Sequence, residues 1–352
     1  MEKAPLRPEM LVLAREEIGM TQKSLAETLG ITQGTLSKLE AGLMGSTPEL
    51  EQNLAKTLNK PLSFFRYQGP IEAPTFVLYR KRVSIPANVH RRFWALITLA
   101  TIRIRQVLTS AEIDTPGLPY VDPNEMAGGP AEIARLLRRY WKIPPGPIKN
   151  VVQYVENAGV VVWVVDFGTR KIDACSMFVG DTPVIFINGC LSAARQRTTI
   201  VHELGHLIMH RNALPDGELE GEAFQFAAEF LTPALEIESS FRPLSMDRLA
   251  RLKLYWGVSM QALVKRAEAM GAISTSTARY YWAKMSREGM KEREPYDDKL
   301  KPEQPTLLPE ILSTYRTELK FTNAELAEHL LITVEELKTI ENSSEPQFTV
   351  VK

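Results

Sequence analysis

The sequence predicts a protein of mainly α-helical class with a small β-sheet in its core, an α+β arrangement, and with an all-helical module at each end. Three observations lead to this prediction. Apolar residues recur at helical spacing through most of the 352 residues. Three short, largely apolar runs between residues 160 and 187 are typical of strands, and the first of them is rich in β-branched residues. Finally, residues 309–341 repeat residues 8–40 without a gap.

The composition is that of a globular protein of two or three domains. Hydrophobic residues make up 44% of the chain, and 42 Lys/Arg balance 42 Asp/Glu. No apolar run reaches the roughly 20 residues of a membrane span, and the N-terminus lacks the pattern of a signal peptide. Two cysteines, Cys175 and Cys190, suit a reducing compartment better than a disulfide framework. We therefore expect a cytoplasmic protein.

Residues 1–66 are expected to form the first helical module. One short helix follows the N-cap residue Thr21 and stops at Gly30, and the next is capped by Thr32. Apolar residues stand where two helices pack across a tight turn, at Leu25, Ala26, Leu29, Ile31, Leu36 and Leu39. This pattern, with Gln22 before it, resembles the helix-turn-helix of Xre/Cro-type repressors.

The resemblance implies binding to operator DNA, with the second helix in the major groove. The side chains expected at base edges are Gln33, Thr35, Ser37 and Lys38. Gln22 and Thr32 are expected to contact phosphate. The alternative is a module used only for dimerisation or packing, and residues 1–66 carry eight Lys/Arg against eight Asp/Glu, which gives no strong electrostatic footprint. Operators of two-fold symmetry make a homodimer the expected assembly.

Residues 67–111 are expected to form a linker and a basic helix. Gly69-Pro70 and Pro74 indicate the linker. No acidic residue lies between Ala73 and Ala111. The basic residues of this stretch can add phosphate contacts beside a DNA reader or pair with acids elsewhere in the fold, and both accounts stay open. They are Arg80, Lys81, Arg82, Arg91, Arg92, Arg103 and Arg105.

The motif that carries chemistry is His202-Glu203-Leu-Gly205-His206, inside a run of helical period. Residues four apart lie on one face of a helix, so His202 and His206 can place two imidazole nitrogens on one zinc ion. Glu203 lies where it can take a proton from a water that zinc activates. Such a pair is otherwise a surface or core pair, but the apolar flanks would bury this one, and buried His and Glu need partners. Gly205, costly in a helix, fits where another backbone passes close by.

A third ligand is expected from the next helix, because a catalytic zinc keeps its fourth position for water. Apolar residues recur there at helical spacing, and Pro233 ends the helix. Of its four glutamates, Glu222 lies at the border of the apolar face and is the expected ligand. The other three, Glu218, Glu220 and Glu229, are expected to be solvated, with Glu220 on the other flank.

Residues 184–233 resemble the ImmA/IrrE family of zinc metallopeptidases. The segments that stand in the family's order and spacing are Val184–Asn188, Arg195–Thr198, His202–His206 and Glu222–Pro233. The resemblance implies a zincin-like fold and a gluzincin-like metalloprotease site, with Glu222 as third ligand. The family usually has Asn and Met where this chain has Phe224 and Thr232. Neither departure removes a ligand.

Residues 112–293 are expected to form this zinc domain with its helical tail. The predicted helices are 131–141 and 151–157, and the predicted strands are 160–166, 174–179 and 184–187. An edge strand of such a sheet can hold a substrate chain by β-augmentation. An oxyanion donor is expected from His210, Tyr280 or Tyr281.

Residues 294–308 are expected to be a linker, and residues 309–352 a second, acidic helix-turn-helix-like module. Fourteen of the 33 positions that align with residues 8–40 are identical, mostly at core and cap positions. The reading surface is not repeated, and residues 302–352 hold four Lys/Arg against nine Asp/Glu. An acidic helix repels phosphate, so we expect a protein-interaction or dimerisation module here, or a cover for the N-terminal reading face.

Together these features predict a cytoplasmic transcription regulator that joins a DNA-binding module to a zinc endopeptidase. The family resemblance implies a protein substrate of repressor type. The alternative is a DNA-binding regulator or antitoxin-like protein whose zinc domain is a sensor or scaffold without proteolysis. Substitution of Glu203 by Gln separates the two, because it keeps zinc and DNA binding and removes only cleavage.

Overall fold

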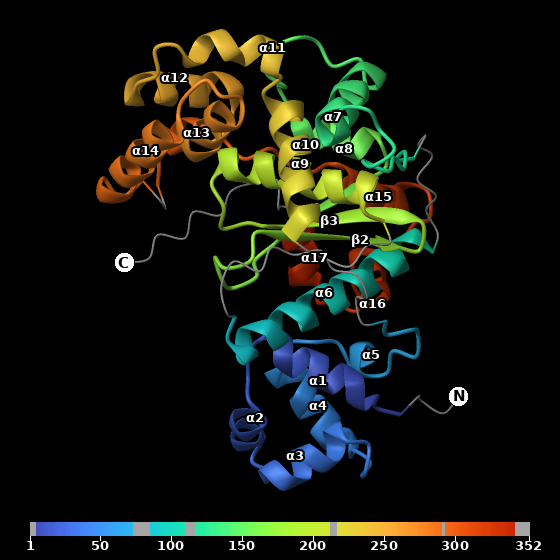
Figure 1. The fold of residues 1–352 in the computed structure, drawn as a ribbon. Coiled ribbons are helices and arrows are strands. Elements are labelled where there is room, and N and C mark those ends of the chain that lie inside the picture. Colours follow the sequence, from blue (N-terminus) through green and yellow to red (C-terminus); the bar gives the residue numbers. More distant parts are fainter. Residues whose placement is uncertain (1–4, 73–84, 110–116, 212–216, 291–292, 342–352) are drawn as a thin grey trace.

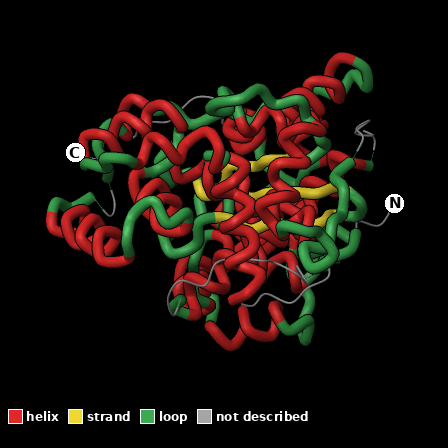
Figure 2. Tube along the Cα trace, turned by 45° about the horizontal axis from the view of Figure 1, so that its top comes forward, coloured by secondary structure: helices red, strands yellow, loops and turns green. Residues whose placement is uncertain are grey.

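The computed structural model describes residues 5–72, 85–109, 117–211, 217–290 and 293–341. The helices of the N-terminal module lie at one end of the molecule, and a long helix, α6, separates them from a central three-stranded sheet (Figure 1). The remaining helices cover both faces of that sheet (Figure 2). The fold is therefore mainly helical with a small buried sheet, as the sequence predicts.

The N-terminal module is built from five helices around one apolar core. Thr21, Thr32 and Thr47 each accept a hydrogen bond from a backbone N–H in the first turn of the helix that follows, which starts α2, α3 and α4. Gly30 ends α2 in the left-handed conformation, with φ of 68°. The bounds are α1 Pro8–Glu17, α2 Gln22–Leu29, α3 Gln33–Glu40, α4 Pro48–Thr57 and α5 Leu62–Phe65.

Helix α6 (Ala87–Leu108) is buried on two sides. Leu99 and Ile102 belong to the core of the N-terminal module, whereas Phe93 and Ile97 belong to the core beneath the sheet. The arginines of α6 are engaged within the fold: Arg103 and Arg105 pair with Glu17 and Glu72, Arg91 pairs with Glu16, and Arg92 donates to the Glu17 carbonyl. These contacts favour the pairing account over phosphate binding for this helix. Arg80, Lys81 and Arg82 lie outside the described residues.

The sheet has the order β1-β3-β2, with β1 parallel and β2 antiparallel to β3. Successive side chains point to opposite faces. On β3, Ile185 and Ile187 enter one core while Val184 and Phe186 enter the other. The sheet is therefore buried on both sides, and β1 and β2 are its edges. The bounds are β1 Val161–Val165, β2 Ala174–Val179 and β3 Thr182–Asn188.

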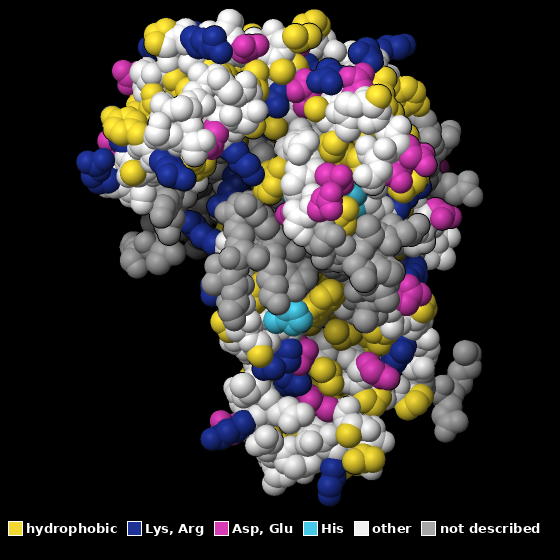
Figure 3. Space-filling view, in the orientation of Figure 1, with side chains coloured by type: hydrophobic (Ala, Val, Ile, Leu, Met, Phe, Trp, Pro, Cys, Tyr) yellow, Lys and Arg dark blue, Asp and Glu magenta, His cyan; other side chains and the backbone are white. Residues whose placement is uncertain are grey.

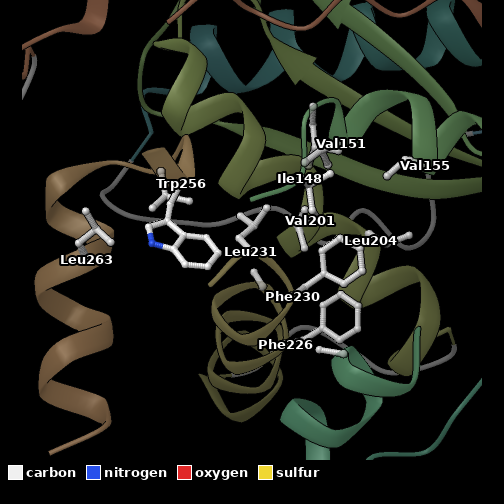
Figure 4. Packing of buried hydrophobic residues seen from close by; sticks show 14 of the residues in the cluster. Ile148, Val151, Val155, Val201, Leu204, Phe226, Phe230, Leu231, Trp256 and Leu263 are labelled. Carbon is white, nitrogen blue, oxygen red and sulfur yellow. The ribbon is translucent and has the colours of Figure 1, made fainter. Parts of the chain in front are cut away.

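One face of the sheet is covered by α9 (Ala193–Met209), which packs against α10 (Gly217–Leu231) and α8 (Val151–Asn157). Figure 4 shows Phe226 and Phe230 of α10 stacked beside Val201 and Leu204 of α9. The other helices on this side of the sheet pack around α9 and α10. They are α7 Gly129–Tyr140, α11 Ala234–Ile237, α12 Met246–Trp256, α13 Met260–Ala269 and α14 Thr275–Arg287.

The opposite face of the sheet is covered by α6 and by the C-terminal module, which consists of α15 (Leu307–Thr317), α16 (Asn323–His329) and α17 (Val334–Glu341). These helices reproduce α1, α2 and α3. The Arg15–Glu40 ion pair of the first copy recurs as Arg316–Glu341. The C-terminal residues are thus a second helix-turn-helix unit, docked against the body of the protein.

Residues 294–308, predicted as a linker, are tied to the half of the molecule that contains α9 by the carboxylates of Glu294 and Glu303. Glu294 accepts from Lys253 and from the first turn of α13. Glu303 accepts from the first N–H groups of α8 at 2.7 and 2.9 Å, and from Arg197. In return, Glu156 of α8 accepts from the first N–H groups of α15, and burial raises the pKa of that carboxyl to about 7. The segment is therefore part of the packed structure.

Within the described part of the chain, no helix has the length and apolar character needed to cross a membrane.

Candidate metal centre

Helix α9 carries the three residues of the predicted motif, and all three are buried. His202 is 5% exposed, Glu203 3% and His206 1%. The helix forms because apolar residues between Ile200 and Ile208 face the two neighbouring layers. A Cβ at Gly205 would lie 3.0 Å from the ring of Phe226 and 3.5 Å from the backbone of Ala223. The expectation that Gly205 permits a close backbone approach is confirmed: α10 is that backbone.

The described residues contain a group of side chains suited to a metal ion, namely His202, His206 and Glu220. The Nε2 atoms of the two histidines are 3.2 Å apart. The Glu220 oxygens lie 3.4 Å from His202 Nε2 and 3.3 Å from His206 Nε2. Zn–N and Zn–O bonds of about 2.0–2.1 Å place the ligand atoms of a tetrahedral site roughly 3.3 Å apart. The triangle therefore has the dimensions and the donor atoms of a zinc site.

The charges at the triangle are those of metal ligands. Burial opposes ionisation of Glu220, but hydrogen bonds to His202 and His206 hold the pKa of its carboxyl well below the ordinary range. Burial lowers the pKa of His206, which keeps its imidazole neutral. A carboxylate and a neutral imidazole are both ligands that zinc accepts.

Glu203 lies next to the triangle and is held by β2. Its Oε2 accepts a hydrogen bond of 2.7 Å from Ser176 Oγ. Burial raises the pKa of Glu203 to about 8, although the hydrogen bond from Ser176 opposes this rise. A cation held by the neighbouring triangle favours the carboxylate form. Ser176 thus orients the Glu203 carboxyl group through Oε2, while Oε1 remains available to accept a proton.

The prediction of Glu222 as third ligand does not match this geometry. Glu222 accepts a hydrogen bond of 2.8 Å from His210 Nε2, and it does not belong to the metal-ligating group. Residues two apart on a helix point about 200° from each other, so Glu220 and Glu222 cannot both face the histidine pair. Glu220 lies three residues before Ala223 and seven before Ala227, on the stripe that packs against α9. The spacing of Glu220 from these two alanines is the sequence feature that could have identified it as the ligand.

A cleft of about 1040 Å³ opens onto His202 and Glu203. Its walls come mainly from α9, α10 and α13, together with Trp282 of α14, Glu294 and Asp297. The lining includes apolar residues such as Leu231 and Val258 and charged ones such as Arg195 and Lys265. Cys190 lines this same cleft. A chain segment can therefore reach the two motif residues from solvent.

The three candidate oxyanion donors lie elsewhere. His210 is buried between His206 and Glu222. The Tyr281 hydroxyl donates to the Leu244 carbonyl at 2.8 Å, and Tyr280 is 56% exposed. None of the three is among the described residues that line the cleft. The structure brings none of them to the cleft.

The predicted DNA-contacting residues surround α3. Gln33, Ser37 and Lys38 are exposed, and Thr35 is half-buried. Gln22 donates to Glu40 at 2.8 Å, and the Thr32 hydroxyl caps α3 through the Thr35 N–H. On the visible face of this module, charges of both signs are scattered (Figure 3). The free face of α3 is thus available for a ligand, with little excess of positive charge.

Comparison with known proteins agrees with both halves of the chain. Residues 155–268 match the family model of the IrrE N-terminal-like domain, a peptidase family, and residues 11–65 match that of the helix-turn-helix domain. The chain thus carries an N-terminal Xre-type helix-turn-helix domain and an IrrE-like domain. The predicted resemblance is confirmed at the level of these two domains.

Two curated relatives are similar over a short stretch. They are uncharacterized HTH-type transcriptional regulators of Sinorhizobium medicae (strain WSM419) and Rhizobium meliloti (strain 1021). Each is 40% identical over 58 residues, which is 16% of this chain and 42% of the relative. The chain therefore spans less than half of the length of either relative.

Proposed function

We propose that this chain is a DNA-binding transcription regulator whose IrrE-like domain is a zinc endopeptidase. The observation that carries the proposal is the triangle formed by the buried His202 and His206 and the half-buried Glu220, beside a cleft that His202 and Glu203 line. A sensor or scaffold would need the triangle alone. A cleft that leads to both the triangle and a carboxylate favours catalysis.

His202, His206 and Glu220 would hold the zinc ion. When bound, Zn²⁺ lowers the pKa of a water to about 7 and polarises a carbonyl group. The three ligands leave a fourth position for that water or for the substrate. Because all three side chains are fixed by the packing of α9 against α10, little reorganisation is needed when the site is loaded.

Glu203 is the proposed general base. Its Oε1 takes a proton from the attacking water and passes it to the nitrogen of the leaving amine, which completes hydrolysis of the peptide bond. Ser176 Oγ donates to Oε2 and holds the carboxylate toward the cleft. Burial of Glu203 keeps bulk water from exchanging this proton.

The proposed substrate is a polypeptide segment in extended form. The cleft is long enough to contact residues of α9, α10 and α13 together, and β2, which holds Ser176, is an edge strand of the sheet. Since α3 would bring the chain to an operator, a repressor-type protein bound there fits as substrate. The proposed base-reading residues are Gln33, Thr35, Ser37 and Lys38, with Gln22 and Thr32 beside them.

The test compares the wild type with Glu203→Gln. Both proteins are expected to bind about one zinc per chain and the same selected DNA, because this substitution leaves the triangle and α3 untouched. Cleavage of a proteome-derived peptide library, followed by mass spectrometry, is expected to fall by about 100- to 10,000-fold. A wild type that binds no supplied zinc, or a variant that cleaves as fast as the wild type, contradicts the proposal.

The ligand assignment has its own test. Glu220→Ala is expected to lose the bound zinc, because it removes one corner of the triangle. Glu218→Ala, on the exposed side of the same helix, is the matched control and is expected to keep it. Equal zinc content in the two variants would exclude Glu220 as a ligand.

A further inference from the structure

Behind His206, on the side away from Glu220, lie two more polar groups, the buried His210 and the half-buried Glu222. His210 Nδ1 is 2.9 Å from His206 Nδ1, and His210 Nε2 is 2.8 Å from Glu222 Oε2. His210 is 3% exposed. The four-residue spacing of His202, His206 and His210 puts all three rings on one face of α9. Glu222 reaches this face from α10, two residues after Glu220.

The hydrogen bonds that link these residues have one consistent direction when His206 serves as a metal ligand. His206 Nε2, which faces His202 Nε2 and Glu220, would then give its lone pair to the metal, so His206 would carry its proton on Nδ1. The Nδ1–H of His206 donates to Nδ1 of a neutral His210, and the Nε2–H of His210 donates to Glu222.

We propose that His210 and Glu222 are positioning residues for the metal ligand His206. Together they fix the plane of its ring, select the tautomer whose Nε2 can bind a metal, and place a negative charge behind the ligand. Groups that accept a hydrogen bond from a ligating histidine raise its basicity and fix its orientation. Here the carboxylate acts through an intervening imidazole. This inference rests on the proposed metal site, and it explains why a glutamate outside the triangle lies so close to it.

The arrangement also links the metal site to the packing of two helices. His206 and His210 belong to α9 and its C-cap, and Glu220 and Glu222 belong to the first turns of α10. The same helix pair thus supplies the triangle and the chain behind it. A purely structural role would require only that buried polar atoms be satisfied, and it would not depend on the direction of the hydrogen bonds.

The first readout is zinc affinity of the full-length protein, measured by competition with a chromophoric chelator. His210→Leu removes both hydrogen bonds and is expected to weaken zinc binding by about 10- to 100-fold. His210→Gln can still accept from His206 and donate to Glu222, so it is expected to restore much of this loss. Glu222→Gln keeps an acceptor without its charge and is expected to fall between the wild type and His210→Leu. Glu218→Gln, the same change on the exposed side of α10, is the control.

The second readout is the tautomer of His210 in the metal-free protein, determined by nitrogen-15 NMR. The wild type is expected to show His210 protonated at Nε2, because Glu222 accepts from that atom and Nδ1 is left to accept from His206. If His210 is protonated at Nδ1 in the wild type, or if a folded His210→Leu binds zinc within about twofold of the wild type, the inference is wrong. A wild type that binds no zinc contradicts instead the proposed function, and the tautomer of His210 still tests the hydrogen bonds behind His206.

Discussion

The N-terminal and C-terminal helical modules are two copies of one unit that meet different surroundings. Both have an arginine in the first helix paired with a glutamate at the end of the third, Arg15 with Glu40 and Arg316 with Glu341. Thr21 and Thr322 cap the second helix in each copy. The positions that the copies share are those that build the helices and hold them together.

The positions at which the copies differ decide what each one contacts. In the first copy, α3 presents Gln33, Ser37 and Lys38 to solvent. In the second, Glu336 of α17 replaces Thr35 and forms an ion pair of 2.6 Å with the buried Lys60 of the first copy. That contact lies after α4 and away from α3, so the C-terminal module does not cover the reading face through it. The same fold thus presents a free helix surface in the N-terminal module and supports the rest of the structure in the C-terminal module.

The sharpest test of this difference is to delete each module in turn. Without residues 302–352, the apolar residues of the sheet that face α15 are uncovered, and Arg197 loses Glu303. We expect an insoluble protein or one without cooperative melting. Deletion of residues 1–72 uncovers mainly Leu99, Ile102 and Leu331, and a soluble, cooperatively melting protein is expected. Calorimetry and near-ultraviolet circular dichroism distinguish the two, and a native-like melting curve without residues 302–352 would refute the supporting role.

The second test breaks the contact between the copies. Lys60 is 5% exposed, and its Nζ lies 2.8 Å from Glu17 and 2.6 Å from Glu336. Lys60→Met leaves both carboxylates without this cation, and we expect the free energy of unfolding to fall by about 3 kcal/mol. Urea denaturation measures the change, with the exposed Lys56→Met as control. If the two variants unfold at the same urea concentration, the ion pairs do not hold the modules together.

The smallest expected effect concerns the two free helix faces. Lys38 of α3 and Lys338 of α17 are both exposed lysines. Lys38→Ala is expected to weaken DNA binding by about 1 kcal/mol, roughly fivefold in Kd, because one cation near the phosphates is lost. Lys338→Ala is expected to leave the Kd unchanged. Fluorescence anisotropy with a DNA sequence selected by the wild type measures both, and equal losses would show that charge alone matters.

Local patterns were enough to find most elements of the fold. Cap residues and the 3.6-residue period placed the helices, and short apolar runs placed β1, β2 and β3, with α8 and β2 correct to the residue. The spacing of His202 and His206 was sufficient as well, because four residues along a helix fix their relative direction without any partner. The close backbone approach at Gly205 could be predicted from the sequence as well, because a glycine is costly inside a helix.

Residues that act across elements could not be assigned in this way. Ser176 lies on β2, and its approach to Glu203 depends on the register of β2 and on how α9 crosses the sheet. From the sequence, the arginines of α6 could be assigned either to phosphate contacts or to internal ion pairs. Their acidic partners, Glu16, Glu17 and Glu72, lie on other segments. Hydrogen bonds and ion pairs over such separations are set by packing, which sequence periodicity does not specify.

By itself, the sequence determined that two imidazoles and a carboxylate stand together on α9, and that the two end modules share a fold. The tertiary structure decided which glutamate completes the triangle and what the second module contacts. The rotation of α10 about its axis turns Glu220 toward the histidine pair and Glu222 toward His210. That rotation is set by Ala223 and Phe226 packing against Gly205, and the outcome depends on both helices at once.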